Sequence, residues 1–159
     1  MDMIAARAVL FKECASDEFK EYGKQVIRNA HALADSLKER DLRLVTGGTD
    51  NHMVVLDLGD TGLDARIAAS ALASVGLMSS VVSVPRDSVR GRGPSGVRLG
   101  TPAVTTRGLL EDEIRQVSEW IALTLERQND LETLAAIRKS VKEMASGYPL
   151  FAKKWLPSS

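Results

Sequence analysis

Residues 17–40 constrain the fold more than any other segment, because they form the longest stretch with almost no helix-breaking residue. The apolar side chains in this stretch recur every three or four positions, which is the period of one helix face. They are Phe19, Tyr22, Val26, Ala30, Leu33 and Leu37. A helix of this kind owes most of its stability to the packing of its apolar face. The segment therefore predicts a long amphipathic helix packed on a larger body.

The preceding segment, residues 3–14, is rich in alanine and carries apolar residues on several sides. This pattern is typical of a helix that is buried against more than one neighbour. We interpret Cys14 within it as a small buried hydrophobe rather than a reactive thiol.

Two β-type runs follow at residues 42–45 and 52–58. The segment between them, residues 46–51, has the glycines and the Asx residues of a turn between antiparallel strands. We therefore expect a hairpin. Thr46, Gly47 and Gly48 are more suited to shaping its turn than to binding phosphate, because no dinucleotide or Walker pattern surrounds them.

The rest of the chain alternates short helices and short strands. We expect a helix at 67–75 that ends at Gly76, strands at 80–84 and 96–100, a loop at 86–96 between them, and helices at 110–125 and 131–144. The strand at 96–100 is expected to end at Thr101 and Pro102. This order predicts an α+β fold with a small, mostly antiparallel sheet flanked by helices.

Length and composition narrow the class of protein. The 159 residues contain no evident linker and are expected to form one domain, residues 1–159. The 21 basic and 21 acidic residues balance, so we expect neither nucleic acid nor a membrane as a partner. The single cysteine excludes an internal disulfide and argues against a metal site. The first residues lack a signal-peptide pattern, which favours a cytoplasmic location.

The segment 90–93 (RGRG) looks like part of an arginine-glycine tract that binds nucleic acid. One short repeat in a neutral protein is more typical of a solvated loop. Its arginines could also meet an anionic ligand at the rim of a site.

Two strings carry a resemblance to a known family, residues 46–52 (TGGTDNH) and residues 95–103 (SGVRLGTPA). They resemble, in the same order, the two best-marked segments of the C-terminal small domain of serine hydroxymethyltransferases. The surroundings are also similar, namely the alanine-rich residues 3–14, the FKEY start at 19–22, the TTRG at 105–108 and the Tyr-Pro at 148–149.

The resemblance implies a fold-type-I pyridoxal-phosphate enzyme whose large domain is absent from this sequence. In the family the cofactor lysine lies in a Thr-His-Lys-Thr-like segment upstream of the matched region, and no lysine of this chain has that context. We therefore expect a partner polypeptide to hold pyridoxal phosphate and this chain to be inactive alone. The family is oligomeric, so an obligate assembly that buries residues 3–14 is expected.

Arg98 is the first candidate for a functional residue. The resemblance implies that it grips the α-carboxylate of an amino-acid substrate, and the planar fork of a guanidinium suits that task. Its alternative role is that of a surface or salt-bridged strand residue. His52 could donate to a cofactor or a carboxylate oxygen, although a histidine that opens a strand is more often structural. Ser95 and Gly96 complete the candidate pocket, together with Thr46, Gly47 and Gly48.

One segment departs from the family. Many members carry Asn-Lys-Asn before a proline, lining the pocket for the pterin of tetrahydrofolate, whereas this chain has SVVSVP at 80–85. Methyl groups replace amides there, and a buried polar edge without hydrogen bonds costs about 1–3 kcal/mol per group. The sequence therefore argues against a folate pocket but not against carboxylate binding.

Three hypotheses remain open at this point. The chain is a subunit of a split enzyme that cleaves or forms the Cα–Cβ bond of β-hydroxy-α-amino acids, a non-catalytic regulator or scaffold that binds a full-length relative, or a truncated fragment of an ordinary enzyme. The start at Met1, where the family's small domain begins, argues weakly against an arbitrary cut.

Overall fold

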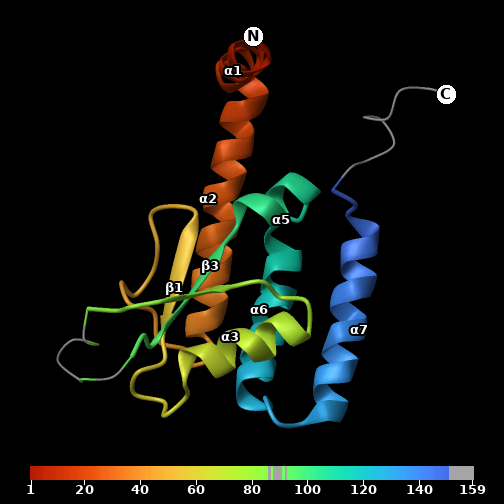
Figure 1. The fold of residues 1–159 in the computed structure, drawn as a ribbon. Coiled ribbons are helices and arrows are strands. Elements are labelled where there is room, and N and C mark those ends of the chain that lie inside the picture. Colours follow the sequence, from red (N-terminus) through yellow and green to blue (C-terminus); the bar gives the residue numbers. More distant parts are fainter. Residues whose placement is uncertain (86, 88–90, 92, 151–159) are drawn as a thin grey trace.

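The computed structural model describes residues 1–85, 87, 91 and 93–150. The expected loop at 86–96, including Arg90 and Arg92, therefore lies partly outside the described residues. The helices in the described part are α1 (Asp2–Cys14), α2 (Asp17–Lys38), α3 (Ala65–Ser74), α5 (Pro102–Arg107), α6 (Glu111–Glu126) and α7 (Leu131–Gly147), and the strands are β1 (Met53–Asp57), β2 (Ser80–Val82) and β3 (Gly96–Gly100) (Figure 1).

The three strands form one antiparallel sheet in the order β1-β3-β2, with β3 in the middle. Arg98 of β3 lies opposite Val55 of β1 and Ser80 of β2. Because successive residues of a strand point to opposite faces, Arg98 and its direct neighbours Val97 and Leu99 lie on different faces. The predicted α+β fold with a small antiparallel sheet is confirmed.

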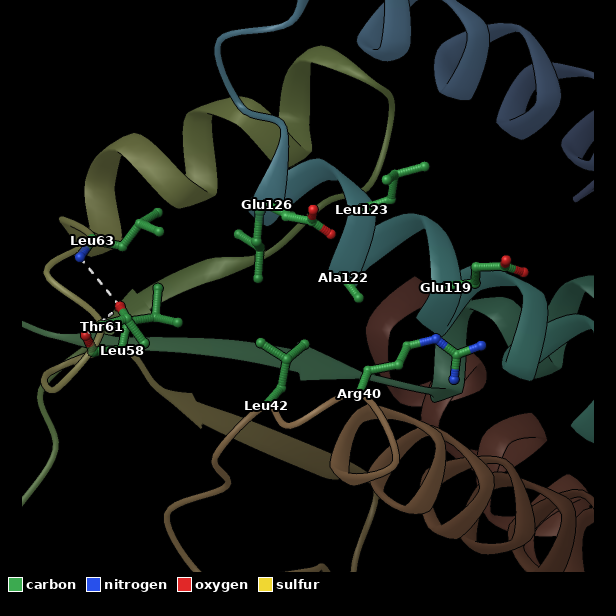
Figure 2. Close-up of a pocket in the computed structure, with 10 residues that line it drawn as sticks. Arg40, Leu42, Leu58, Thr61, Leu63, Glu119, Ala122, Leu123 and Glu126 are labelled. Atoms are coloured by element: carbon green, nitrogen blue, oxygen red, sulfur yellow. Dashed lines mark hydrogen bonds between the residues drawn. The ribbon is translucent and has the colours of Figure 1, made fainter.

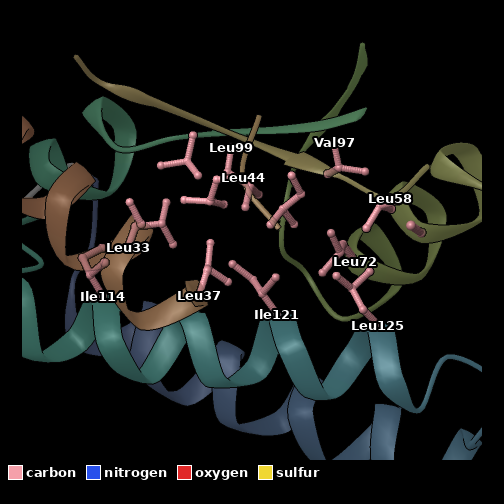
Figure 3. Packing of buried hydrophobic residues seen from close by; sticks show 14 of the residues in the cluster. Leu33, Leu37, Leu44, Leu58, Leu72, Val97, Leu99, Ile114, Ile121 and Leu125 are labelled. Atoms are coloured by element: carbon pink, nitrogen blue, oxygen red, sulfur yellow. The ribbon is translucent and has the colours of Figure 1, made fainter. Parts of the chain in front are cut away.

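The core lies on one face of this sheet. The inward residues of β1 and β3 pack against α2, α3 and α6, and Figure 3 shows their side chains converging in the space between the sheet and these helices. The larger buried side chains that these elements contribute are Leu33, Leu37, Val54, Leu56, Leu72, Val97, Leu99, Ile114, Ile121 and Leu125. The predicted inward face of α2 is confirmed for Val26, Ala30, Leu33 and Leu37, whereas Phe19 near the start of the helix is exposed.

The expected strand at 42–45 is wrong as a full strand. Its antiparallel pairing with β1 is limited to a single bridge between Leu44 and Leu56. Two backbone bonds support this bridge, from the Val45 N–H to the Val55 carbonyl at 3.0 Å and from the Asp57 N–H to the Arg43 carbonyl at 2.9 Å. The chain leaves α2 through Asp41, whose φ of 58° is left-handed, so only a few residues reach β1 before the turn begins.

Helix α5 was not predicted, because the proline at 102 suggested only the end of a strand. Pro102 occupies the first turn of α5, where its missing N–H leaves no bond unmade. Gly108 ends the helix with a left-handed φ of 98°. The strand carrying Arg98 is therefore followed at once by a helix.

Helix α1 was expected to be buried against more than one neighbour, but it is exposed in this chain. It lies beyond the N-terminal end of α2, away from the sheet (Figure 1), and none of its residues is buried. Ile4 and Phe11 are each 69% exposed. Cys14 is exposed as well, so its interpretation as a buried hydrophobe is wrong for the chain by itself. The reason is that no other element in the described part of the chain covers α1.

Candidate functional site

The sheet has a second face that no helix of the core cluster covers. We call it the open face and define it by Met53, Val55, Ser80, Arg98 and Gly100. Arg98 and Gly100 are exposed there, whereas Val97 and Leu99, on the opposite face, are buried. The strand alternation that buries Val97 and Leu99 thus obliges Arg98 to face outward.

Arg98 lies beside a hollow of about 510 Å³, which we call the Arg98 hollow. Its lining comes from the start of β1, from the segment that leads into β2, and from the end of β3. The lining residues are His52, Met53, Met78, Ser79, Ser80, Arg98, Leu99 and Gly100. The structure therefore brings together two of the predicted site residues, Arg98 and His52.

The polar groups of this hollow have few partners of their own. Neither the Arg98 guanidinium nor the His52 imidazole has a hydrogen bond or an ion pair with any other described residue, and the buried hydroxyl of Ser79 also has no partner within that part of the chain. An exposed guanidinium without an internal partner can offer its whole fork of donors to an incoming carboxylate. The arrangement suits the binding of a small anion.

The turn at 46–51 borders the open face next to the Arg98 hollow. Gly47 has a left-handed φ of 68°, which supports the predicted role of Gly47 in shaping the turn. The Thr49 hydroxyl donates to the carbonyl of Met53 at 2.6 Å. The turn encloses a separate hollow of about 400 Å³ that includes Thr46, Gly47 and Gly48 and shares Met53 with the Arg98 hollow. These three residues are neighbours of the Arg98 site and do not line it.

Ser95 and Gly96 lie at the other end of β3 and are both buried. Asp87 holds Ser95, since its carboxylate accepts bonds from the Ser95 hydroxyl, the Ser95 N–H at 3.0 Å and the Val84 N–H at 2.8 Å. Asp87 was not among the predicted site residues. The available signal was an aspartate three residues after Val84, because a short acidic side chain in a loop commonly accepts bonds from nearby backbone N–H groups. Ser95 and Gly96 thus position the strand and do not reach the Arg98 hollow.

Thr101 ties the end of β3 to its surroundings. Its hydroxyl donates to the carbonyl of Val26 in α2 at 2.9 Å, and its N–H donates to the carbonyl of His52 at 3.1 Å. Thr101 is only 1% exposed, so these bonds are shielded from water. One residue therefore fixes both walls of the Arg98 hollow relative to α2.

A buried amide secures α5 on the same helix. The Asn29 side chain of α2 is fully buried and donates to the Thr105 hydroxyl at 2.8 Å and to the Leu109 carbonyl at 2.9 Å. Its own oxygen accepts a bond from Gln25 at 2.9 Å. This network could not be predicted from the residue pattern, because Asn29 lies on a helix whose polar residues are mostly solvated.

The described residues do not supply a covalent attachment for pyridoxal phosphate. The described lysines, Lys12, Lys20, Lys24, Lys38, Lys139 and Lys142, lie on α1, α2 and α7, and none lines a hollow of the open face. Lys153 and Lys154 lie outside the described residues. No cluster of three His, Cys, Asp or Glu side chains suited to a metal ion occurs in the described ranges. Among the described residues, no lysine therefore lies in the lining of the Arg98 hollow or of the hollow at the turn.

A second groove of about 420 Å³ lies between the end of α2, the segment after β1 and the helix α6 (Figure 2). Leucines dominate its floor, and Arg40 and two glutamates of α6 stand at its rim. The labelled lining residues are Arg40, Leu42, Leu58, Thr61, Leu63, Glu119, Ala122, Leu123 and Glu126. This groove shares no lining residue with the Arg98 hollow.

Where the structure describes the chain, no helix is both long enough and apolar enough to cross a bilayer. This finding concerns the helices listed above, of which α2 is the longest with 22 residues.

Comparison with known proteins identifies the family. A family model described as "Serine hydroxymethyltransferase" matches residues 1–121. The serine hydroxymethyltransferase of Methanospirillum hungatei is 42% identical over 151 residues, which are 95% of this chain and 36% of that protein. The Koribacter versatilis protein is 41% identical over 96% of this chain and 36% of its own length, and the Myxococcus xanthus protein is 42% identical over 97% and 37%.

The chain spans about 36% of the length of the curated relatives that it matches. The family match covers β1, β2, β3 and the whole Arg98 hollow, so the resemblance expected from residues 46–52 and 95–103 is confirmed. The chain belongs to the serine hydroxymethyltransferase family.

Proposed function

We propose that this chain completes the active site of a pyridoxal-phosphate enzyme by binding the α-carboxylate of an amino-acid substrate through Arg98. A separate polypeptide would hold the cofactor and its lysine. The reaction would form or cleave the Cα–Cβ bond of a β-hydroxy-α-amino acid. Because the chain corresponds to about 36% of its relatives, Arg98 would have the same role if the sequence were one part of a longer protein.

The observation that carries this proposal is the exposed Arg98 in the centre of the open face, whose guanidinium bonds to no other described residue. A scaffold needs no charge at that position, because the residue contacts no acidic group among the described residues. The neighbours across the sheet, Val55 and Ser80, are uncharged and do not compete for its donors. The guanidinium is therefore available for a bidentate pair with a carboxylate.

The contribution of Arg98 would be positioning. A bidentate grip fixes the orientation of the carboxylate and hence of the adjacent α-carbon, which is where bonds change in the proposed reaction. Thr101 supports this role because it anchors the end of β3 to α2. His52 stands in the same hollow and would donate to an anionic oxygen of the ligand.

The test is co-expression of the chain with a pyridoxal-phosphate-binding large-domain polypeptide of the family, followed by purification of the complex and a retro-aldol assay on a β-hydroxy-α-amino acid. Arg98→Ala should leave the complex assembled and lower kcat/KM by about 10- to 100-fold, the loss expected for one charge-assisted contact. Arg98→Lys should recover only part of this loss, since an ammonium lacks the fork.

Arg138→Ala is the matched control, because Arg138 is an exposed arginine on α7. Unchanged activity in Arg98→Ala would instead favour a non-catalytic scaffold. A large-domain polypeptide that is fully active alone and never associates with this chain would overturn the split-enzyme proposal.

We further infer that the proposed enzyme does not use a folate carrier. Val82 lies opposite Gly96, on the same face of the sheet as Arg98, so an apolar side chain stands at that end of β2. A pterin edge placed there would lose hydrogen bonds. The same assay with tetrahydrofolate should show no stimulation, and a clear rate increase would refute this inference.

A further inference from the structure

Two glycines flank Arg98 on its own strand and on its own face, Gly96 and Gly100. A glycine inside a strand is unfavourable unless the structure needs it, since it packs no side chain and loses much chain entropy on folding. Such a glycine often marks a place where a ligand or another backbone approaches closely. The two positions can be distinguished by what a methyl group would meet at each.

Gly96 is required by the fold. A Cβ atom at this position would lie 2.7 Å from Val84 Cγ1 and 2.8 Å from the carbonyl oxygen of Val82. Both distances are shorter than real side-chain contacts. The backbone of β2 approaches β3 so closely here that no side chain fits.

Gly100 is not required by the fold. A Cβ atom there would meet the carbonyl oxygen of His52 at 3.6 Å and Pro102 Cδ at 3.8 Å, which are ordinary van der Waals distances. The residue does not have the positive φ that would demand glycine. It is exposed, so no backbone of the described chain occupies the space above it.

Gly100 nevertheless lines the Arg98 hollow. It lies two residues after Arg98 in β3 and on the same face of the sheet. We propose that Gly100 is a specificity-determining residue, whose missing side chain leaves room for the ligand carboxylate to lie flat over the end of β3 beside Arg98. This inference rests on the proposed function and names its ligand class, a small carboxylate that approaches the strand backbone. Any side chain at this position would occupy the same space.

The test uses the complete chain, labelled with ¹⁵N and titrated with L-serine, and with L-serinamide as a probe without a carboxylate. L-serine should cause saturable shifts at Arg98, His52 and Gly100, and L-serinamide should not. Gly100→Val should weaken L-serine binding by about tenfold or more, because overpacking a site commonly costs the equivalent free energy. Gly100→Ala should weaken binding to a smaller extent.

Stability provides a second readout that separates this role from a structural one. Gly100→Ala should keep or raise the midpoint of urea unfolding, because it restricts the unfolded chain without a clash. If the fold needed glycine at this position, the substitution would lower the midpoint. Gly23→Ala, in α2 with open space around its Cβ, is the matched control and should leave binding unchanged.

The outcomes distinguish the two proposals. No saturable binding by the wild-type chain would overturn both the Arg98 site and the role of Gly100. Wild-type binding that persists undiminished in Gly100→Val and Gly100→Ala would overturn the Gly100 inference alone. If the Gly100 variants bind L-serine normally but no longer associate with a large-domain polypeptide, the Gly100 inference is also overturned. That result would indicate that the backbone of a partner fills the space above Gly100.

Discussion

At the scale of single residues, Gly96 and Thr101 hold the two ends of β3. Gly96 permits the close approach of Val82 and Val84, and Thr101 bonds to α2 and to His52. Arg98 lies between these fixed points. Its orientation therefore follows from the backbone of β3 and does not require a salt bridge of its own.

We expect Gly96→Ala to destabilise the chain by about 1–3 kcal/mol, because the new methyl group must displace Val84 or the β2 backbone. Urea unfolding measures this change. Gly23→Ala serves again as the control and should stabilise α2 by about 0.5–1 kcal/mol. An unaltered unfolding midpoint in Gly96→Ala would contradict the close approach of β2 and β3.

At the scale of elements, the end of α7 is tied to the start of α6 by one hydrogen bond. The Tyr148 hydroxyl donates to the Glu113 carboxylate at 2.8 Å, and the same carboxylate accepts from the Leu110 N–H at 3.0 Å. The bonds from Leu110 and Tyr148 hold the pKa of Glu113 below its ordinary value of 4.5. The bond to Glu113 raises the pKa of the Tyr148 phenol above its ordinary value of 10.0.

The two shifts predict a pH window for this contact. A carboxyl with a lowered pKa stabilises the fold fully above its unfolded pKa and loses that effect as the pH falls through the folded pKa. A phenol with a raised pKa stabilises the fold fully below its unfolded pKa, and this stabilisation is lost as the pH rises through the folded pKa. Tyr148→Phe should therefore lower stability between about pH 5 and pH 9, with a difference that shrinks outside this range.

Thermal unfolding across this pH range checks the expectation. Tyr22→Phe is the matched control, because Tyr22 bonds to the Pro102 carbonyl and the Thr106 hydroxyl, which do not titrate in the acid range. Its effect should stay constant as the pH falls. A Tyr148→Phe difference that is equally constant down to strongly acid pH would show that Glu113 is not the acceptor.

At the scale of the whole molecule, α1 is an exposed helix that packs little against the rest of the described chain. A helix of 13 residues without a buried side chain is barely stable in water, and several large apolar residues of α1 are more than half exposed. Exposed apolar surface of this kind marks an interaction site. No residue of α1 lines the Arg98 hollow, so a partner that covers α1 need not block Arg98.

We therefore expect the chain alone not to persist as a stable monomer at micromolar concentration. Replacing Ile4, Leu10 and Phe11 together by serine should yield a monomer on sizing chromatography with unchanged near-ultraviolet circular dichroism, because none of the three contributes to the core. A wild-type chain that already elutes as a stable monomer would contradict the assembly. The same triple variant should also fail to associate with a large-domain polypeptide.

The sequence by itself determined most of the amphipathic face of α2, the strand at 96–100 and the family, because period and motif are local properties of the chain. It could not determine that residues 42–45 form only one bridge, that Pro102 begins a helix, or that Asn29 and Asp87 are buried anchors, since these depend on contacts between distant segments. The same holds for the glycines beside Arg98. Only the tertiary structure shows that Val82 and Val84 occupy the space next to Gly96, whereas the space next to Gly100 is open. Two identical residues in one strand differ only in what packs against them.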